Sequence, residues 1–153
     1  MIQIIAIGKI KEKAMQSMIE EYAKRLKPIH SITMVELPNS VKKDTDVKGI
    51  IDDESSRILE KIDDKTFVIL LDLKGKDLSS PEMSEKLIDV IDRGLNIAFV
   101  IGGSHGVSDL VRQRAQFRWK ISNLTFPHQL IRVMLYEQIY RMFMISKNHP
   151  YHK

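Results

Sequence analysis

The sequence predicts an α/β fold, in which a mostly parallel sheet carries helices on both faces. Strand-like and helix-like patterns alternate along the whole chain, as they do in proteins with parallel sheets. Two runs, 67–71 (FVILL) and 97–101 (IAFVI), are apolar without interruption, which is typical of strands covered on both faces. Loops rich in glycine or turn residues follow the later strands, where open α/β sheets usually bind their ligands.

The first part of the chain is expected to form two strand–helix pairs. Residues 2–7 are rich in β-branched side chains and predict a strand. In 12–26 the apolar residues recur every three or four positions, which indicates a helix with one buried face. Residues 32–37 alternate in the manner of a strand, and 47–62 again places its isoleucines on one helical face.

The middle of the chain has clear boundaries. The strand 67–71 is followed by a loop at 72–76. Ser80 is then expected to cap a helix that has Pro81 in its first turn and ends near Arg93, where Gly94 closes it.

The last part of the chain is expected to continue the alternation. After the strand 97–101 the sequence predicts a helix over 107–117, a short strand over 119–122 and a final helix over 127–146. The final helix is apolar on nearly all sides, so we expect it to be buried on more than one side. A partner subunit is the expected second cover, which predicts a homodimer; the alternative is a central helix in a monomer.

Composition narrows the class of protein. A chain of 153 residues is most simply one domain, 1–153, and it contains no cysteine, so disulfides, Cys-type metal sites and a Cys nucleophile are excluded. The sequence has neither a membrane-spanning run nor a signal-peptide pattern, which makes a cytoplasmic location the expectation.

Positive charge is concentrated at the end of the chain. Residues 112–153 contain eight Lys or Arg and one acidic residue, for a net charge of +7, whereas residues 1–111 carry −3. Such a basic third points to a polyanion such as nucleic acid, and an ordinary solvated surface is the alternative.

The glycine loop Gly102-Gly103-Ser104-His105-Gly106 allows more than one interpretation. It lacks the spacing of a dinucleotide-binding loop, but it matches the G-x-S-x-G pattern of serine hydrolases with Ser104 as nucleophile. Asp109 or Glu137, with His128, His149 or His152, would complete that triad. The favoured interpretation is instead that the glycines let the main chain approach a ligand closely.

The last five residues and one arginine are further candidates. Tyr151 lies between two histidines and Lys153, a set that can stack on a base, move protons and bind phosphate; no carboxylate accompanies the histidines, so no metal site is expected. Arg132 stands on the apolar final helix, where an arginine either pairs with a carboxylate or lines a site. Glu137 and Arg141 are spaced to form an ion pair.

Four separated motifs together resemble one known family. LDLKGK, IGGSHG, SNLTFPHQLIRVMLYEQIYR and NHPYHK follow in the order and spacing of the ribosomal RNA large subunit methyltransferase H family, a SPOUT-class (trefoil-knot) family, and the opening IIAIGKIKE also resembles it. The resemblance covers essentially the whole chain.

This resemblance implies an S-adenosylmethionine-dependent enzyme that methylates N3 of a pseudouridine in 23S ribosomal RNA, on the assembled ribosome and as a homodimer. It also implies a C-terminal trefoil knot, which ordinary folding rules would not predict. By matching motifs, the methyl donor would be held by Leu71, Gly102, Gly103, Ile121, Ser122, Asn123, Leu124, Thr125 and Phe126.

We expect the tail to act on the target base, in its own subunit or across the dimer. His149, Tyr151 and His152 are the catalytic candidates, and Arg132 and Lys153 the candidates for binding substrate phosphates. The alternative from another class is a non-catalytic protein that binds RNA or the ribosome, and a serine hydrolase using Ser104 is a further alternative.

Overall fold

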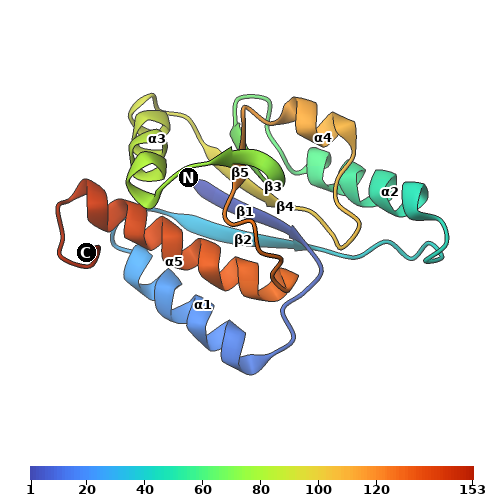
Figure 1. The fold of residues 1–153 in the computed structure, drawn as a ribbon, viewed down its shortest axis with the longest axis horizontal. Helices are drawn as coiled ribbons and strands as arrows, with labels where there is room; N and C mark the ends of the chain where they lie inside the picture. Colours follow the sequence, from blue (N-terminus) through green and yellow to red (C-terminus); the bar gives the residue numbers. More distant parts are fainter.

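The computed structural model describes all residues, 1–153, and shows one five-stranded sheet (Figure 1). Every neighbouring pair of strands is parallel, and the order across the sheet is β2-β1-β4-β3-β5. The strands are β1 (Ile2–Ile7), β2 (Ile32–Leu37), β3 (Phe67–Asp77), β4 (Ile97–Ile101) and β5 (Phe117–Lys120). The helices are α1 (Lys13–Leu26), α2 (Val47–Glu60), α3 (Ser80–Asp92), α4 (Asp109–Arg114) and α5 (His128–Ser146).

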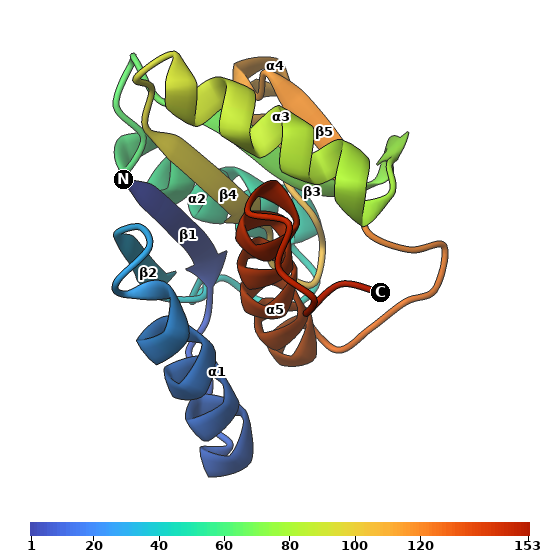
Figure 2. The same cartoon turned by 90° about the vertical axis from the view of Figure 1, so that its left-hand side faces the viewer.

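Helices cover both faces of the sheet, and the predicted fold class is confirmed. Helices α1, α3 and α5 lie on one face, and α2 and α4 lie on the other (Figures 1 and 2). The fully buried strand β4 divides its side chains between the two cores: Phe99 packs with the first group of helices, and Val100 with the second. This is why its sequence is apolar without alternation.

Several boundaries differ from those that the sequence predicts: α2 ends at Glu60, α4 begins at Asp109 and β5 ends at Lys120. Three further differences have a visible cause or consequence. The helix cap is Ser79 rather than Ser80, because the Ser79 side chain accepts from the Glu82 amide while the Glu82 carboxylate accepts from the Ser79 amide. The predicted helix 107–117 ends at Arg114, and β5 begins at Phe117 instead of Trp119. Gln116 explains the early end of the helix, because its amide donates to the Val68 carbonyl at 3.0 Å and so already follows strand β3.

The predicted loop 72–76 lies within β3 as a bulge. Trp119 of β5 is paired first with Leu71 and then with Lys76, so that residues 72–75 stand out from the ladder. A Cβ atom on Gly75 would lie 2.6 Å from the backbone of Arg118, which only glycine allows. The bulge therefore returns close against β5 after leaving the sheet.

Helix α5 lies on the sheet between α1 and α3 (Figure 2). This arrangement covers much of its apolar surface within one chain, yet a row of half-exposed residues remains along it: Leu130, Met134, Glu137 and Arg141. In a homodimer, a second subunit could pack on this half-exposed row. The homodimer and the trefoil knot stay predictions. None of the helices combines the length and apolar character that crossing a membrane requires.

Candidate functional site

A cleft of about 760 Å³ opens at the carboxyl ends of β3, β4 and β5, beside the first turn of α5. It is built by the β3 bulge, the glycine loop after β4 and the loop 121–127 after β5. Because parallel strands end at a common edge, these three loops meet although they are far apart in the sequence. Its volume lies within the range of small-molecule sites.

Most of the residues expected to hold a ligand line this cleft. They are Leu71, Gly102, Gly103, Ile121, Ser122, Leu124, Thr125 and Phe126. Asn123 does not line it; its side-chain oxygen instead accepts a hydrogen bond from Lys120 Nζ at 2.8 Å.

The two adjacent glycines of the cleft occupy positions without room for a side chain. A Cβ on Gly102 would lie 2.6 Å from Val107 Cγ1, and one on Gly103 would lie 2.3 Å from the Glu54 carboxylate. Glu54 is itself buried and accepts from the Ser40 amide at 2.9 Å. The main chain at Gly102 and Gly103 thus packs closely against Val107 and Glu54, and its other side lines the cleft and is open to a ligand.

An ion pair fixes the bulge that forms one wall. Arg118 donates to the Asp72 carboxylate at 2.7 and 2.8 Å. Burial alone would raise the pKa of Asp72, but the Lys74 amide and the Arg118 guanidinium outweigh it and lower that pKa. Asp72 therefore stays ionised at neutral pH, and its pair with Arg118 anchors the bulge to β5.

The cleft also contains groups that have no partner within the chain. Trp119 lines it and is buried, and its indole Nε1–H has no hydrogen-bond acceptor. Leu73 and Leu124 stand on two of the bordering loops with 63% and 67% of their surface exposed. Exposed large apolar side chains and a buried unpaired donor are features that a bound ligand or partner would satisfy.

The serine hydrolase interpretation finds no support in the geometry. Ser104 is exposed, no hydrogen bond joins it to a histidine, and Asp109 pairs with Arg112 at 2.7 Å. Glu137 lies at the middle of α5, and His149 and His152 lie in the tail that follows it, away from Ser104. No group of three or more His, Asp or Glu side chains is placed to hold a metal ion.

Arg132 does not line the cleft and is 1% exposed. It pairs with Glu36 of β2 at 3.1 Å and donates to the carbonyl oxygens of Ile7 and Gly8. Burial lowers the pKa of this guanidinium, and the Glu36 charge opposes that effect. Of the two alternatives for this residue the structure shows the carboxylate pair, and a buried guanidinium has no exposed atom to offer a phosphate.

The C-terminal tail folds back onto the last turns of α5. Tyr151 donates from its hydroxyl to Glu137 at 3.0 Å, and its ring meets the edge of Tyr140 at a centroid distance of 4.9 Å. Arg141 lies over the same ring at 4.8 Å, pairs with Glu137 at 2.7 Å and contacts His152 Nδ1 at 3.1 Å. The expected Glu137–Arg141 pair is confirmed, and Tyr151 and His152 are gathered around it.

His149 and Lys153 complete this end of the molecule. His149 Nδ1 accepts from the Tyr151 amide at 3.1 Å, and Lys153 is exposed. Burial above all, and then Tyr22 and Glu137, raise the pKa of the Tyr151 phenol. Tyr151 is therefore a neutral hydrogen-bond donor at ordinary pH. The sequence predicted the Glu137–Arg141 pair but not the packing of Tyr140 against Tyr151, although Tyr140 follows Glu137 by three residues on the same helix.

The cleft lies at the first turn of α5, whereas the tail packs along its second half, from Glu137 onwards. The helix has 19 residues and is therefore about 28 Å long. His128 at its start lines the cleft, and the tail begins after its end at Ser146. Glu137 lies about 14 Å along the helix axis from His128, so the tail stays apart from the cleft of its own chain while it is bonded to Glu137 and Arg141.

Comparison with known proteins agrees with this geometry. The family model described as "Predicted SPOUT methyltransferase" matches residues 1–152. The chain is 46% identical to a protein named ribosomal RNA large subunit methyltransferase H from Desulfitobacterium hafniense (strain Y51), over 99% of this chain and 98% of that one. The chain belongs to this family of SPOUT methyltransferases. A second relative of the same name, from Clostridium botulinum (strain 657 / Type Ba4), is 45% identical over 99% of both chains.

A solved structure supports the fold of this SPOUT methyltransferase independently. A methylase family protein from Neisseria gonorrhoeae superposes with a TM-score of 0.51 at 16% identity, over 92% of this chain and 81% of that one. At this identity the likeness concerns the fold alone. The sequence resemblance to the ribosomal RNA large subunit methyltransferase H family is thus confirmed, and the protein is a methyltransferase by family.

Proposed function

We propose that this protein transfers a methyl group from S-adenosylmethionine to N3 of a pseudouridine in 23S ribosomal RNA, on the assembled ribosome. The observation that carries the proposal is the cleft formed by three loops at the carboxyl edge of the sheet, in a chain of this methyltransferase family. We also propose that residues 1–153 act as one domain, that the chain is knotted, and that it works in the cytoplasm, where ribosomes are found.

The residues of the cleft fit S-adenosylmethionine. Its walls include apolar side chains that can enclose a purine, among them Ile121, Phe126 and Ile131. The absence of a side chain at Gly102 and Gly103 lets main-chain N–H and C=O groups reach the polar edges of a flat ligand. When bound, S-adenosylmethionine supplies an electrophilic methyl group on a sulfonium centre, and no protein nucleophile is required.

The acceptor side of the site is proposed to come from a second subunit. Since the tail of one chain is bonded along the second half of α5 and the cleft lies at its first turn, a homodimer that places its two α5 helices in opposite directions would bring the tail of each chain to the cleft of the other. The half-exposed row along α5 is the surface available for such pairing.

The hydrogen bonds of the tail suggest what its residues do. His152 and His149 both receive a donor at Nδ1, from Arg141 and from the Tyr151 amide, so the neutral imidazoles carry their proton on Nε2. Each can then donate a hydrogen bond. N3 of a pseudouridine lies between two carbonyl groups, and donors to those oxygens make the N3 proton more acidic. Tyr151 supplies a ring on which a base can stack, while Lys153 is free to bind phosphate.

The proposal is tested by methyl transfer from labelled S-adenosylmethionine to ribosomes that lack this modification, followed by nucleoside analysis. Label in N3-methylpseudouridine is the expected result. Label in another nucleoside would refute the proposed target. Absence of label on both ribosomes and free RNA, together with unchanged fluorescence of Trp119 when S-adenosylmethionine is added, would favour a non-catalytic RNA-binding protein.

A further inference from the structure

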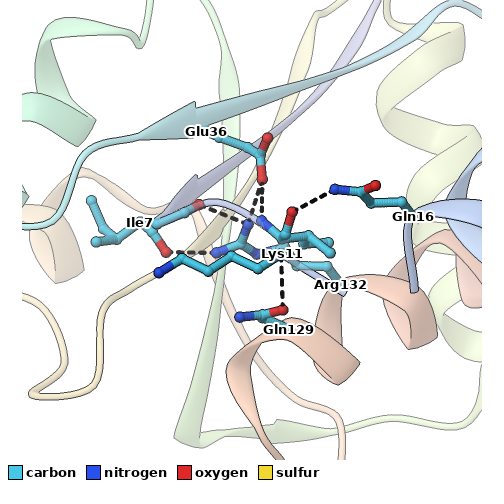
Figure 3. A network of polar contacts seen from close by, with 8 residues as sticks. Ile7, Lys11, Gln16, Glu36, Gln129 and Arg132 are labelled. Carbon is cyan, nitrogen blue, oxygen red and sulfur yellow. Dashed lines mark hydrogen bonds and ion pairs between the residues drawn. The ribbon is translucent and has the colours of Figure 1, made fainter. Parts of the chain in front are cut away.

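The segment between β1 and α1, residues 8–12, forms neither helix nor strand, yet its backbone is fixed. Figure 3 shows the polar network around it. The Gly8 amide donates to the Leu37 carbonyl at 2.6 Å, and Gly8 has a φ of +86°, which favours glycine. We call this segment, with its lysines Lys9 and Lys11, the lysine loop.

Two charged residues of other elements hold the beginning of the lysine loop. Glu36 of β2 accepts from the Ile10 amide at 2.7 Å, and Arg132 of α5 donates to the Gly8 carbonyl at 2.8 Å (Figure 3). Because Arg132 and Glu36 are also paired with each other, the loop is fastened to β2 and α5 at once.

Two glutamines hold its second part. Gln16 of α1 donates to the Ile10 carbonyl at 2.8 Å, and Gln129 of α5 accepts from the Lys11 amide at 3.3 Å (Figure 3). The backbone of the lysine loop is therefore hydrogen-bonded to three different elements, β2, α1 and α5.

The side chains of the lysine loop alternate between the interior and solvent. Ile10 is buried at 5% exposure and packs in the core with α1 and α5. Lys9 and Lys11 on either side of it are exposed, and neither takes part in an ion pair. Four side chains of other elements thus fix the backbone of a segment that exposes two ammonium groups without partners.

The lysine loop lies near the cleft, although none of its own residues lines it. Gln129, which bonds to Lys11, follows His128 of the cleft lining, and Ile7 at the end of β1 lies beside Gly103. Helix α5 also begins here without a side-chain cap, so its first amide groups add positive potential to the same region.

We propose that the lysine loop is a prearranged contact for the phosphodiester backbone of the RNA substrate, next to the nucleotide that enters the cleft. The inference rests on the proposed function. Free ammonium groups on a fixed backbone bind phosphates without the cost of ordering a loop. They contribute affinity and register and carry no base specificity, so they should affect binding of the ribosome and leave the methyl-transfer step alone.

The test compares two double variants that remove the same charge. Lys9→Gln/Lys11→Gln neutralises the lysine loop, and Lys61→Gln/Lys65→Gln removes two exposed lysines near the opposite edge of the sheet, before β3. For each protein we would measure the dissociation constant for ribosomes between 50 and 300 mM KCl (about the range in which counterion release is resolved), kcat for methyl transfer, and S-adenosylmethionine binding through Trp119 fluorescence.

The lysine-loop variant should bind ribosomes about tenfold more weakly near 100 mM salt, and its log–log salt slope should be shallower by about 1.5, for two lost phosphate contacts. Its kcat and its binding of S-adenosylmethionine should equal those of the unsubstituted chain, and the control should match that chain throughout. Equal ribosome affinity in both variants would overturn the proposal. Failure of the proposed function is a separate result, because the unsubstituted chain would then transfer no methyl group at all.

Discussion

At its first turn α5 borders a cleft of glycines, exposed leucines and an unpaired Trp119 N–H, whereas at its last turn it carries a tail whose polar groups are bonded to one another. The first end has room for a ligand, with His105 and His128 among its lining residues. The second part gathers Tyr151 and His152 around the Glu137–Arg141 pair and has no comparable cavity. The difference is the basis of our proposal that one chain contributes two half-sites, which lie at different places along α5.

The largest expected effect concerns the stability of the cleft end. Arg132→Met leaves the Ile7 and Gly8 carbonyls and the Glu36 carboxylate without their donor, and should lower the free energy of unfolding by about 3 kcal/mol. Urea unfolding measures this. Arg93→Met is the control, because Arg93 forms only an exposed pair with Asp89 and its loss should cost less than about 1 kcal/mol. Equal losses would show that the buried network does not stabilise this end.

The next effect separates the two ends by function. Tyr151→Ala should lower kcat about a hundredfold, because it removes a ring proposed to position the target base. The affinity for S-adenosylmethionine should not change, since the cleft lies at the other end of α5. Tyr151→Phe keeps the ring and loses only the bond to Glu137, so it should retain most activity. Full activity in single alanine variants of Tyr151, His149 and His152 would refute the assignment of the tail.

A pH effect is expected from the middle of α5, between the two ends. Burial, and secondarily the charge of Glu36, raises the pKa of Tyr136 from 10 to about 12. A raised pKa in the folded state means that the stability contributed by the neutral phenol is complete below pH 10 and is lost as the pH rises toward 12. The loss should reach about 2 kcal/mol. In unfolding experiments across this range the loss should be larger in the unsubstituted chain than in Tyr136→Phe, which keeps the raised pKa of Tyr151. Identical pH profiles would contradict the assignment.

A smaller effect tests the wall of the cleft. Gly75→Val places a side chain against the backbone of Arg118 and should push the β3 bulge away from β5. We expect S-adenosylmethionine to bind about tenfold more weakly, as followed by Trp119 fluorescence, because an apolar wall is displaced. Lys76→Val, one position further on and exposed, is the control and should bind normally. Unchanged affinity in Gly75→Val would show that the bulge does not contact the methyl donor.

Features that depend on residues close together in the sequence could be predicted, whereas features that depend on distant residues could not. Strands β1, β2 and β4 begin and end where expected, because local apolar patterns and the residues Gly8, Pro38 and Gly102 mark them. The predicted boundary between α4 and β5 was wrong because Gln116 bonds to Val68, and no local pattern in the sequence indicates this contact between distant residues.

The candidate site shows the same limit. The glycines of the cleft could be identified because main-chain approach leaves a trace in composition. The position of Arg132 could not, since its partner Glu36 is 96 residues away and the sequence permits either a carboxylate pair or a ligand contact. The ordered conformation of the tail likewise depends on contacts of Tyr151 with Tyr140 and Glu137, which the sequence of the last five residues does not reveal.

The central claim is that a complete site combines the cleft of one subunit with the tail of another. It is tested most directly by mixing two variants, Gly75→Val in the cleft and Tyr151→Ala in the tail, and measuring methyl transfer to ribosomes. The S-adenosylmethionine concentration is kept well below its Kd, where each variant alone is impaired. Mixed dimers contain one site with both halves intact, so an equal mixture should recover about a quarter of the activity of the unsubstituted protein. Recovery of no activity, in a mixture shown by native mass spectrometry to contain mixed dimers, would contradict the account.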